Sequence, residues 1–139
     1  MQQKKVVIIG GGFAGSTAAR KLENDFNVTL IDAKDYFEFT PSVLRTLVEP
    51  QHIKKIQVLH KNYLNKAVIA KGNAADITKK EVIANKRKFP YDYLIISSGS
   101  EYEPPIKGKD IVIAARAKEL VKYSEKLKKA SNVLIVGGG

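Results

Sequence analysis

The stretch KVVIIGGGFAGSTAARKL, residues 5–22, decides the fold of this chain. It opens with Val6 to Ile9, an unbroken apolar run of the kind found in a central parallel strand that is covered on both faces. Three glycines follow, and from Phe13 onward small and apolar residues recur at helical spacing. We therefore expect a strand, a tight glycine loop and a helix, in a parallel sheet with helices on both faces.

The glycine loop fits the pattern G-x-G-x-x-G, with its glycines at Gly10, Gly12 and Gly15. This pattern, placed directly after a strand and at the start of a helix, is typical of dinucleotide-binding folds. Gly10 allows the tight turn, Gly12 keeps a Cβ atom out of the path of a diphosphate, and Gly15 lets the helix lie close to its strand. Because the N–H groups and dipole of a helix start attract anions, the loop is predicted to hold a diphosphate.

An acidic residue supports this interpretation. The second buried run, 28–31, ends in Asp32, about 20 residues beyond the middle glycine, where a carboxylate accepts ribose hydroxyls of an adenosine. The alternative is that the glycines only build a turn and that Asp32 is an ordinary loop carboxylate. Lys34 also leaves two alternatives, contact with the 2′-phosphate of NADP or a place in solvent or beside adenosine. Asp32 would repel that phosphate, which favours the second.

Further apolar and charged runs indicate the remaining elements. Short buried strands are predicted at 94–96, 111–113 and 133–136, a helix from Pro41 to Val48, and a charged helix over 118–129. Polar turns separate three further strands, which suggest a small antiparallel insertion beside the main sheet, at 67–70, 74–78 and 81–84.

The end of the chain repeats its beginning. Residues 5–12 read KVVIIGGG and residues 132–139 read NVLIVGGG. The last eight residues thus restate the first strand and the start of its glycine loop. We expect them to begin a second nucleotide-binding unit.

Composition excludes several classes of function. The 139 residues contain no cysteine, so the chain has no disulfide framework, thiolate metal site, thiol nucleophile or dithiol redox pair. His52 and His60 are interpreted as surface or packing residues, and we assign no catalytic and no metal-binding residue. No apolar run approaches the roughly 18 residues needed to span a bilayer, and no signal peptide precedes the first strand. The simplest expectation is one soluble, cytoplasmic domain.

The net charge of +10 is spread over scattered lysines rather than gathered with aromatic residues. A platform for single-stranded nucleic acid interleaves basic and aromatic side chains, so we do not expect nucleic acid as a partner. A solvated lysine-rich surface is the favoured interpretation. A functional face for a polyanion or a membrane is the alternative.

Three segments carry a resemblance to a known family: VVIIGGGFAGSTAA (6–19), IDAKDYFEFTP (31–41) and YDYLIISSGS (91–100). They resemble the FAD-dependent pyridine nucleotide oxidoreductases, flavoproteins with two dinucleotide-binding domains. Among these they are most similar to type II NADH dehydrogenases and apoptosis-inducing-factor-like NAD(P)H:quinone oxidoreductases. The resemblance implies an α/β fold, a Rossmann-like FAD/NAD(P)-binding domain with a central parallel sheet and a small antiparallel β insertion. It also implies an FAD-binding domain over 1–131 and the start of an NAD(P)H-binding domain over 132–139.

The resemblance implies a set of cofactor-binding residues. Ser97 and Ser98 stand where the family has Ala and Thr, and Ser98 keeps the hydroxyl. The segment around Arg45 is expected near the flavin ring or its ribityl chain, although Thr40 and Pro41 are equally explained as the cap of a helix. The residues implied to contact the diphosphate are Gly10, Gly12, Phe13, Ala14 and Gly15, and the turn of Ser97, Ser98 and Gly99 is implied to come close to it. Asp32 would contact the adenosine ribose, Ala33 and Lys34 would flank that ribose, and the backbone of Ala74 would bond the adenine edge.

The function implied is electron transfer from NAD(P)H through FAD to a quinone or another small acceptor. Without cysteine, electrons would pass through the flavin alone. The alternatives are a non-catalytic FAD- or ADP-binding unit and a plain NAD(P)-binding Rossmann module. By themselves the 139 residues are expected to lack dehydrogenase activity. Any peripheral contact with the inner face of a membrane would come from a region beyond them, and the oligomeric state is left open.

Overall fold

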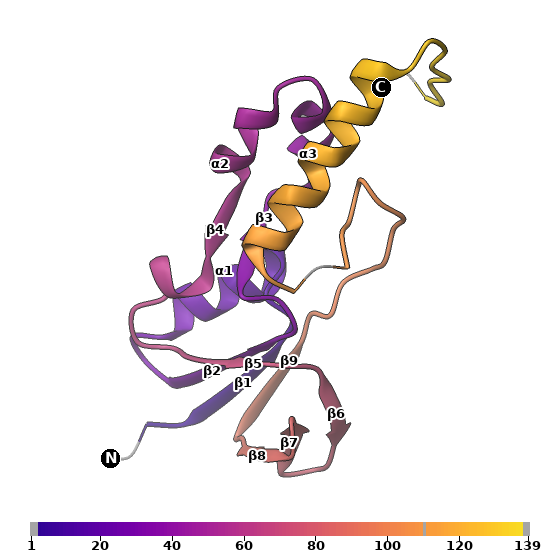
Figure 1. Cartoon of the computed structure of the whole chain (residues 1–139). Coiled ribbons are helices and arrows are strands. Elements are labelled where there is room, and N and C mark those ends of the chain that lie inside the picture. Colours follow the sequence, from indigo (N-terminus) through magenta and orange to yellow (C-terminus); the bar gives the residue numbers. More distant parts are fainter. Residues whose placement is uncertain (1–2, 110, 138–139) are drawn as a thin grey trace.

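A parallel sheet forms the centre of the computed structural model, which describes residues 3–109 and 111–137 (Figure 1). Its strands are β1 (Lys5–Ile9), β2 (Asn27–Asp32), β5 (Val68–Lys71) and β9 (Tyr93–Ile96), in the spatial order β5-β2-β1-β9. Helix α1 (Phe13–Leu22) connects β1 to β2. The predicted α/β, Rossmann-like class is confirmed.

The two faces of the sheet are covered differently. Val6 and Ile8 of β1 pack with Ala19 of α1, whereas Val7 and Ile9 lie in a second cluster with Phe89 of an antiparallel sheet. That sheet consists of β6 (Ala74–Ile77), β7 (Glu81–Ala84) and β8 (Arg87–Pro90). Figure 1 shows α1 and β6 to β8 on opposite sides of the central strands. The expectation of helices on both faces was therefore wrong, because a small sheet buries one face of this sheet.

A second packing unit follows β2. Strand β3 (Tyr36–Glu38) pairs antiparallel with β4 (Gln57–Leu59). A cluster that includes Val43 and Leu120 joins the long helix α3 (Ile113–Lys129) to the segments between these strands. The helical elements are η1 (Thr40–Leu47), η2 (Pro50–His52), α2 (Ile53–Ile56), η3 (His60–Asn62) and α3 (Ile113–Lys129). No helix in the described parts of the chain combines the length and apolarity that a membrane crossing requires.

Several predicted elements differ from the observed ones. The strand predicted at 67–70 as part of the antiparallel insertion is β5, which joins the main sheet parallel to β2. The insertion is completed instead by β8. The helix predicted after Pro41 is the 3₁₀ helix η1. Residues 111–113 form no strand, because Ile113 is the first residue of α3.

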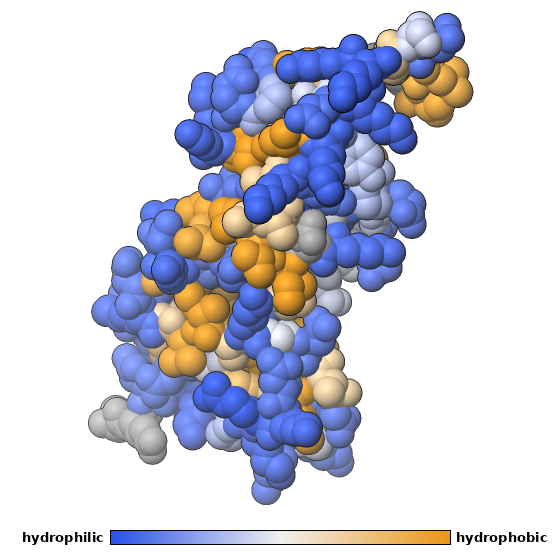
Figure 2. Space-filling view, viewed as in Figure 1, coloured by the Kyte–Doolittle hydropathy of each residue, from blue (hydrophilic) through white to orange (hydrophobic). Residues whose placement is uncertain are grey.

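The predicted strand at 133–136 is also wrong. These residues have no regular structure, and Leu134 is 88% exposed. A strand requires a neighbouring strand to pair with, and among the described residues this segment has none. Figure 2 shows an apolar group at this end of the molecule. Residues 138–139 lie outside the described residues, so the domain boundary at 131 stays a prediction.

Glu23 fastens α1 to the chain that leads into β5. It is buried at the end of α1, and its Oε2 accepts the backbone N–H groups of Asn65, Lys66 and Ala67 at 2.9, 2.8 and 3.0 Å. Burial raises the pKa of this carboxyl, but the three hydrogen bonds and the charge of Lys66 outweigh burial. The pKa of Glu23 therefore lies below the ordinary value of 4.5.

Replacing Glu23 with Gln should lower the free energy of unfolding by about 1–3 kcal/mol at neutral pH, since charge-assisted hydrogen bonds are lost. A depressed folded-state pKa contributes stability above the unfolded pKa, and this contribution disappears as the pH falls through the folded value. Urea unfolding at neutral pH and below 4.5 should therefore show the difference between wild type and variant shrinking in acid. The exposed Glu125→Gln serves as control, and a pH-independent difference would contradict this role of Glu23.

Candidate nucleotide-binding site

The candidate site lies where four parallel strands end together. Ile9 is in register with Ile31 on one side and with Ile96 on the other, and Asp32 is in register with Lys71. The glycine loop follows β1 at this edge. Strands β2 and β5 follow β1 on one side of it, and the next strand of this sheet, β9, lies on the other side of β1. The strand order therefore reverses beside the glycine loop. In open α/β sheets, ligands bind at such a reversal.

Two of the three motif glycines are required by their neighbours. Gly10 has a φ of +94°, its N–H donates to the carbonyl of Ile31 at 2.8 Å, and a Cβ atom there would overlap the Ser97 carbonyl. A Cβ atom on Gly15 would overlap the Gly10 carbonyl oxygen. These contacts hold the loop against α1 and against the segment after β9.

Gly12 has a different environment. A Cβ atom on Gly12 would meet no heavy atom within 4 Å, so the space above this residue is open. Gly12 is the N-cap of α1, and among the residues that the structure describes no side chain caps this end and no acid lies in the first turn. The N–H groups at a helix start lack intrahelical partners. An open, uncapped and positively polarised helix start fits the diphosphate of a dinucleotide.

Asp32 is held in one orientation at the end of β2. Its Oδ2 accepts the Gly11 N–H at 2.9 Å and lies 3.0 Å from His60 Nε2, and its Oδ1 accepts the Lys34 N–H at 3.1 Å. The side chain is 14% exposed. A carboxylate offers about four lone-pair positions, so these three contacts leave room on Oδ1 for a ribose hydroxyl.

The residues that surround Asp32 were not predicted from the sequence motif. Gly11 needs to be glycine, because a Cβ atom there would overlap Asp32 Oδ2 and lie 2.6 Å from His60 Cε1. His60 is completely buried, which agrees with its interpretation as a packing residue. Tyr63 and Ser16 continue the polar cluster from His60. His60 directly follows β4, a strand that the sequence pattern did not predict, so no motif placed this histidine under the loop.

The surroundings of Tyr63 favour its protonated form. Burial raises the pKa of its phenol, and the negative charge of Asp32 raises the pKa further. The net shift is upward from 10.0. Tyr63 is therefore a hydrogen-bond donor at neutral pH.

The serine turn after β9 joins the same edge. Ser97 Oγ lies 2.9 Å from the Ile9 carbonyl oxygen and 3.1 Å from that of Gly10, so its hydroxyl donates to the end of β1. Ser98 and Gly99 follow and are exposed. Ser97 thus supports the loop, and Ser98 and Gly99 border the open side.

The other predicted residues are placed less uniformly. Ala33 and Lys34 follow Asp32, and the Lys34 ammonium lies 5.6 Å from the centre of the Tyr36 ring. Ala74 begins β6, two residues after Gly72, whose N–H donates to the Asp32 carbonyl at 2.7 Å. These residues therefore share the edge with the loop.

Phe13 and Arg45 lie toward the second packing unit. The Phe13 ring makes edge contacts with Phe37 at 5.1 Å and Phe39 at 5.5 Å between centroids. Ala14 follows it in the first turn of α1. Arg45 forms an ion pair with Glu49 at 3.1 Å and is exposed. Its contact with a flavin stays a prediction.

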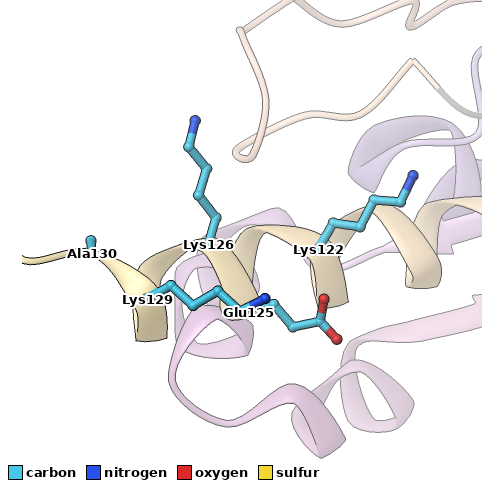
Figure 3. Close-up of a pocket in the computed structure, with 5 residues that line it drawn as sticks. All are labelled: Lys122, Glu125, Lys126, Lys129 and Ala130. Carbon is cyan, nitrogen blue, oxygen red and sulfur yellow. The ribbon is translucent and has the colours of Figure 1, made fainter.

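A lysine-lined hollow of the described surface is remote from this edge. It lies on the outer side of α3, and Figure 3 shows its lining side chains fanning away from the helix, mostly lysines. The residues are Lys122, Glu125, Lys126, Lys129 and Ala130. A shallow, solvent-facing hollow of this kind does not compete with the strand ends as the nucleotide site.

Comparison with known proteins gives the family. Residues 4–139 match the pyridine nucleotide-disulphide oxidoreductases, and the chain belongs to this family. It is 32% identical to apoptosis-inducing factor homolog B of Dictyostelium discoideum over 143 residues, which cover 99% of this chain and 36% of that protein. The chain thus spans little more than a third of that relative's length. The predicted resemblance is confirmed, and so are FAD and NAD(P)H as the cofactors of the family.

Solved structures agree. The sulfide:quinone oxidoreductase of Aquifex aeolicus superimposes with a TM-score of 0.68 at 26% identity, covering 91% of this chain and 32% of that one. NDH2 from Plasmodium falciparum in complex with NADH gives a TM-score of 0.65 at 24% identity, covering 74% of this chain and 24% of that one. The second likeness shows the shared fold.

Replacement by alanine should destabilise the protein more at Gly15 than at Gly12. Gly15→Ala should lower the free energy of unfolding by about 1–3 kcal/mol, because the new methyl group overlaps backbone. Gly12→Ala should cost less than about 1 kcal/mol, because its methyl group enters open space and only the N-cap preference changes. Urea unfolding followed by circular dichroism measures both. Equal losses would contradict the loop geometry.

Proposed function

We propose that this chain is the FAD-binding part of a flavin-dependent NAD(P)H dehydrogenase, which passes electrons from NAD(P)H through FAD to a quinone or another small acceptor. One observation carries the proposal: the uncapped start of α1, open above Gly12, shares a strand edge with the oriented Asp32 carboxylate. Family membership supports FAD as the dinucleotide bound there.

The residues of this chain would bind the dinucleotide and orient it. The N–H groups at the start of α1 would receive the diphosphate, and Asp32 Oδ1 would accept a ribose hydroxyl of the adenosine. Ser98 and Gly99 would border the diphosphate, and the Ala74 backbone would meet the adenine edge. When bound, FAD supplies the redox chemistry itself. No side chain described here is needed as an acid or a base.

A plain NAD(P)-binding module is the second candidate, because the same edge fits any adenosine diphosphate. The visible absorbance bands of flavin in the purified protein separate the two functions. The acceptor and the peripheral membrane contact are parts of the proposal that rest on the resemblance, and the cytoplasmic location is a part that rests on the sequence composition. The quinone is favoured because a structural relative is a sulfide:quinone oxidoreductase.

Asp32→Ala should weaken the binding of ADP and of FAD by about 1–3 kcal/mol, because a charge-assisted hydrogen bond to the ribose is lost. Titration calorimetry on the full chain measures this loss. Asp25→Ala is the matched control, since Asp25 is exposed in the turn after α1, and it should leave both affinities unchanged. Unaltered binding by Asp32→Ala would remove Asp32 from the site and with it the proposed function.

A further inference from the structure

A continuous chain of polar contacts runs beneath the glycine loop. Asp32 Oδ2 lies 3.0 Å from His60 Nε2, and His60 Nδ1 lies 2.6 Å from the Tyr63 hydroxyl. That hydroxyl lies 2.7 Å from Ser16 Oγ, which lies 2.7 Å from the Gly11 carbonyl oxygen. This series of contacts thus begins at the Asp32 carboxylate, which is assigned to the ribose, and ends at the glycine loop, which is assigned to the diphosphate.

The direction of each hydrogen bond in this series follows from the acceptor at its end, the Gly11 carbonyl oxygen. The Gly11 carbonyl has no hydrogen, so the Ser16 hydroxyl donates to it. The single hydrogen of Ser16 is then used, so the Tyr63 hydroxyl donates to Ser16. Tyr63 oxygen consequently accepts, and His60 Nδ1 carries the hydrogen that it accepts.

The contact with Asp32 needs one hydrogen more. The four contacts require four hydrogens, whereas Ser16, Tyr63 and a neutral imidazole supply one each. The fourth lies between His60 Nε2 and Asp32 Oδ2. Because two backbone N–H groups already donate to Asp32 as they would to a carboxylate, the hydrogen belongs to the imidazole.

His60 is buried, so a positive charge on its imidazole requires a negative partner. The side chain is fully buried, and its contacts come from three elements: Asp32 of β2, Tyr63 after η3, and the closely approached Gly11 of the loop. Its backbone N–H donates to the Asp35 carbonyl at 3.1 Å, which fixes the main chain. A buried cation requires a partner charge, and Asp32 is the charge that it contacts.

We propose that His60 is a positioning residue of the dinucleotide site, whose imidazolium orients the Asp32 carboxylate toward the ribose and, through Tyr63 and Ser16, braces the loop carbonyl of Gly11. This proposal rests on the proposed function, since it assumes that Asp32 binds the adenosine ribose. His60 does not touch the ligand. It acts through Asp32, so its effect on binding should depend on Asp32 being present.

A matched pair of substitutions tests this dependence. In His60→Gln the terminal amide replaces Nε2 and still donates to Asp32, whereas in His60→Asn the shorter side chain reaches Tyr63 but not Asp32. ADP affinity, measured by calorimetry on the full chain, should fall about tenfold in His60→Asn and stay within about threefold of wild type in His60→Gln. In an Asp32→Ala background, His60→Asn should add less than about a twofold change.

The charge state of His60 has its own readout, which is measured on the wild-type chain. Nitrogen NMR of the histidine-labelled wild-type chain at neutral pH should show both ring nitrogens of His60 protonated. The chain has two histidines, and His60→Gln, or failing that His52→Gln, assigns them. His52 lies apart, with Nε2 2.8 Å from Ser42 Oγ.

The outcomes are distinguishable. An unprotonated ring nitrogen in His60 overturns the proposal, and so do equal losses of ADP affinity from His60→Asn with and without Asp32, while the proposed function survives both results. If Asp32→Ala alone leaves ADP affinity unchanged, the proposed function falls together with this inference.

Discussion

The hydrogen bond from the Gly11 N–H to the Asp32 carboxylate is the contact on which the rest of the structure depends. It joins the loop after β1 to the end of β2 across 21 positions of sequence. The contact requires a residue without a Cβ atom at Gly11, since any side chain would overlap the carboxylate. It also turns the carboxylate so that Oδ1 remains available for a ligand. The same hydrogen bond therefore both packs the loop and orients the Asp32 carboxylate for binding.

Two further constraints act at the same edge. Ser97 binds the carbonyl oxygens at the end of β1, and the carbonyl of Ser97 leaves no space for a side chain on Gly10. Beneath the loop, His60 carries the Asp32 contact into the interior through Tyr63. Contacts with Asp32, Ser97 and His60 hold the loop in place, and the space above Gly12 stays open. Rigid surroundings of this kind favour binding, because little order has to be created when the ligand arrives.

Local patterns predicted the part of the fold that local contacts determine. The run from Val6 to Ile9, the glycine loop and the acid at Asp32 lie within one βαβ unit, where neighbours in sequence are neighbours in space. Pairing partners and directions are set by distant residues, so the strand at 67–70 was assigned to the wrong sheet. The apolar run at 111–113 was mistaken for a strand because a short apolar run fits either element. His60 reaches Asp32 across 28 positions, and no spacing rule indicates such a contact.

The central claim is that an adenosine diphosphate binds at the carboxyl edge of the sheet, between the start of α1 and Asp32. Amide NMR spectra of the nitrogen-labelled full chain, recorded while ADP is added, test it directly. The largest shifts should fall on residues 12–15 and 32–34, with smaller ones after β9 at 97–99. If instead they fall on the lysine-rich hollow of α3 at 122–130, ADP binds there as a simple anion, and the strand edge is not the nucleotide site.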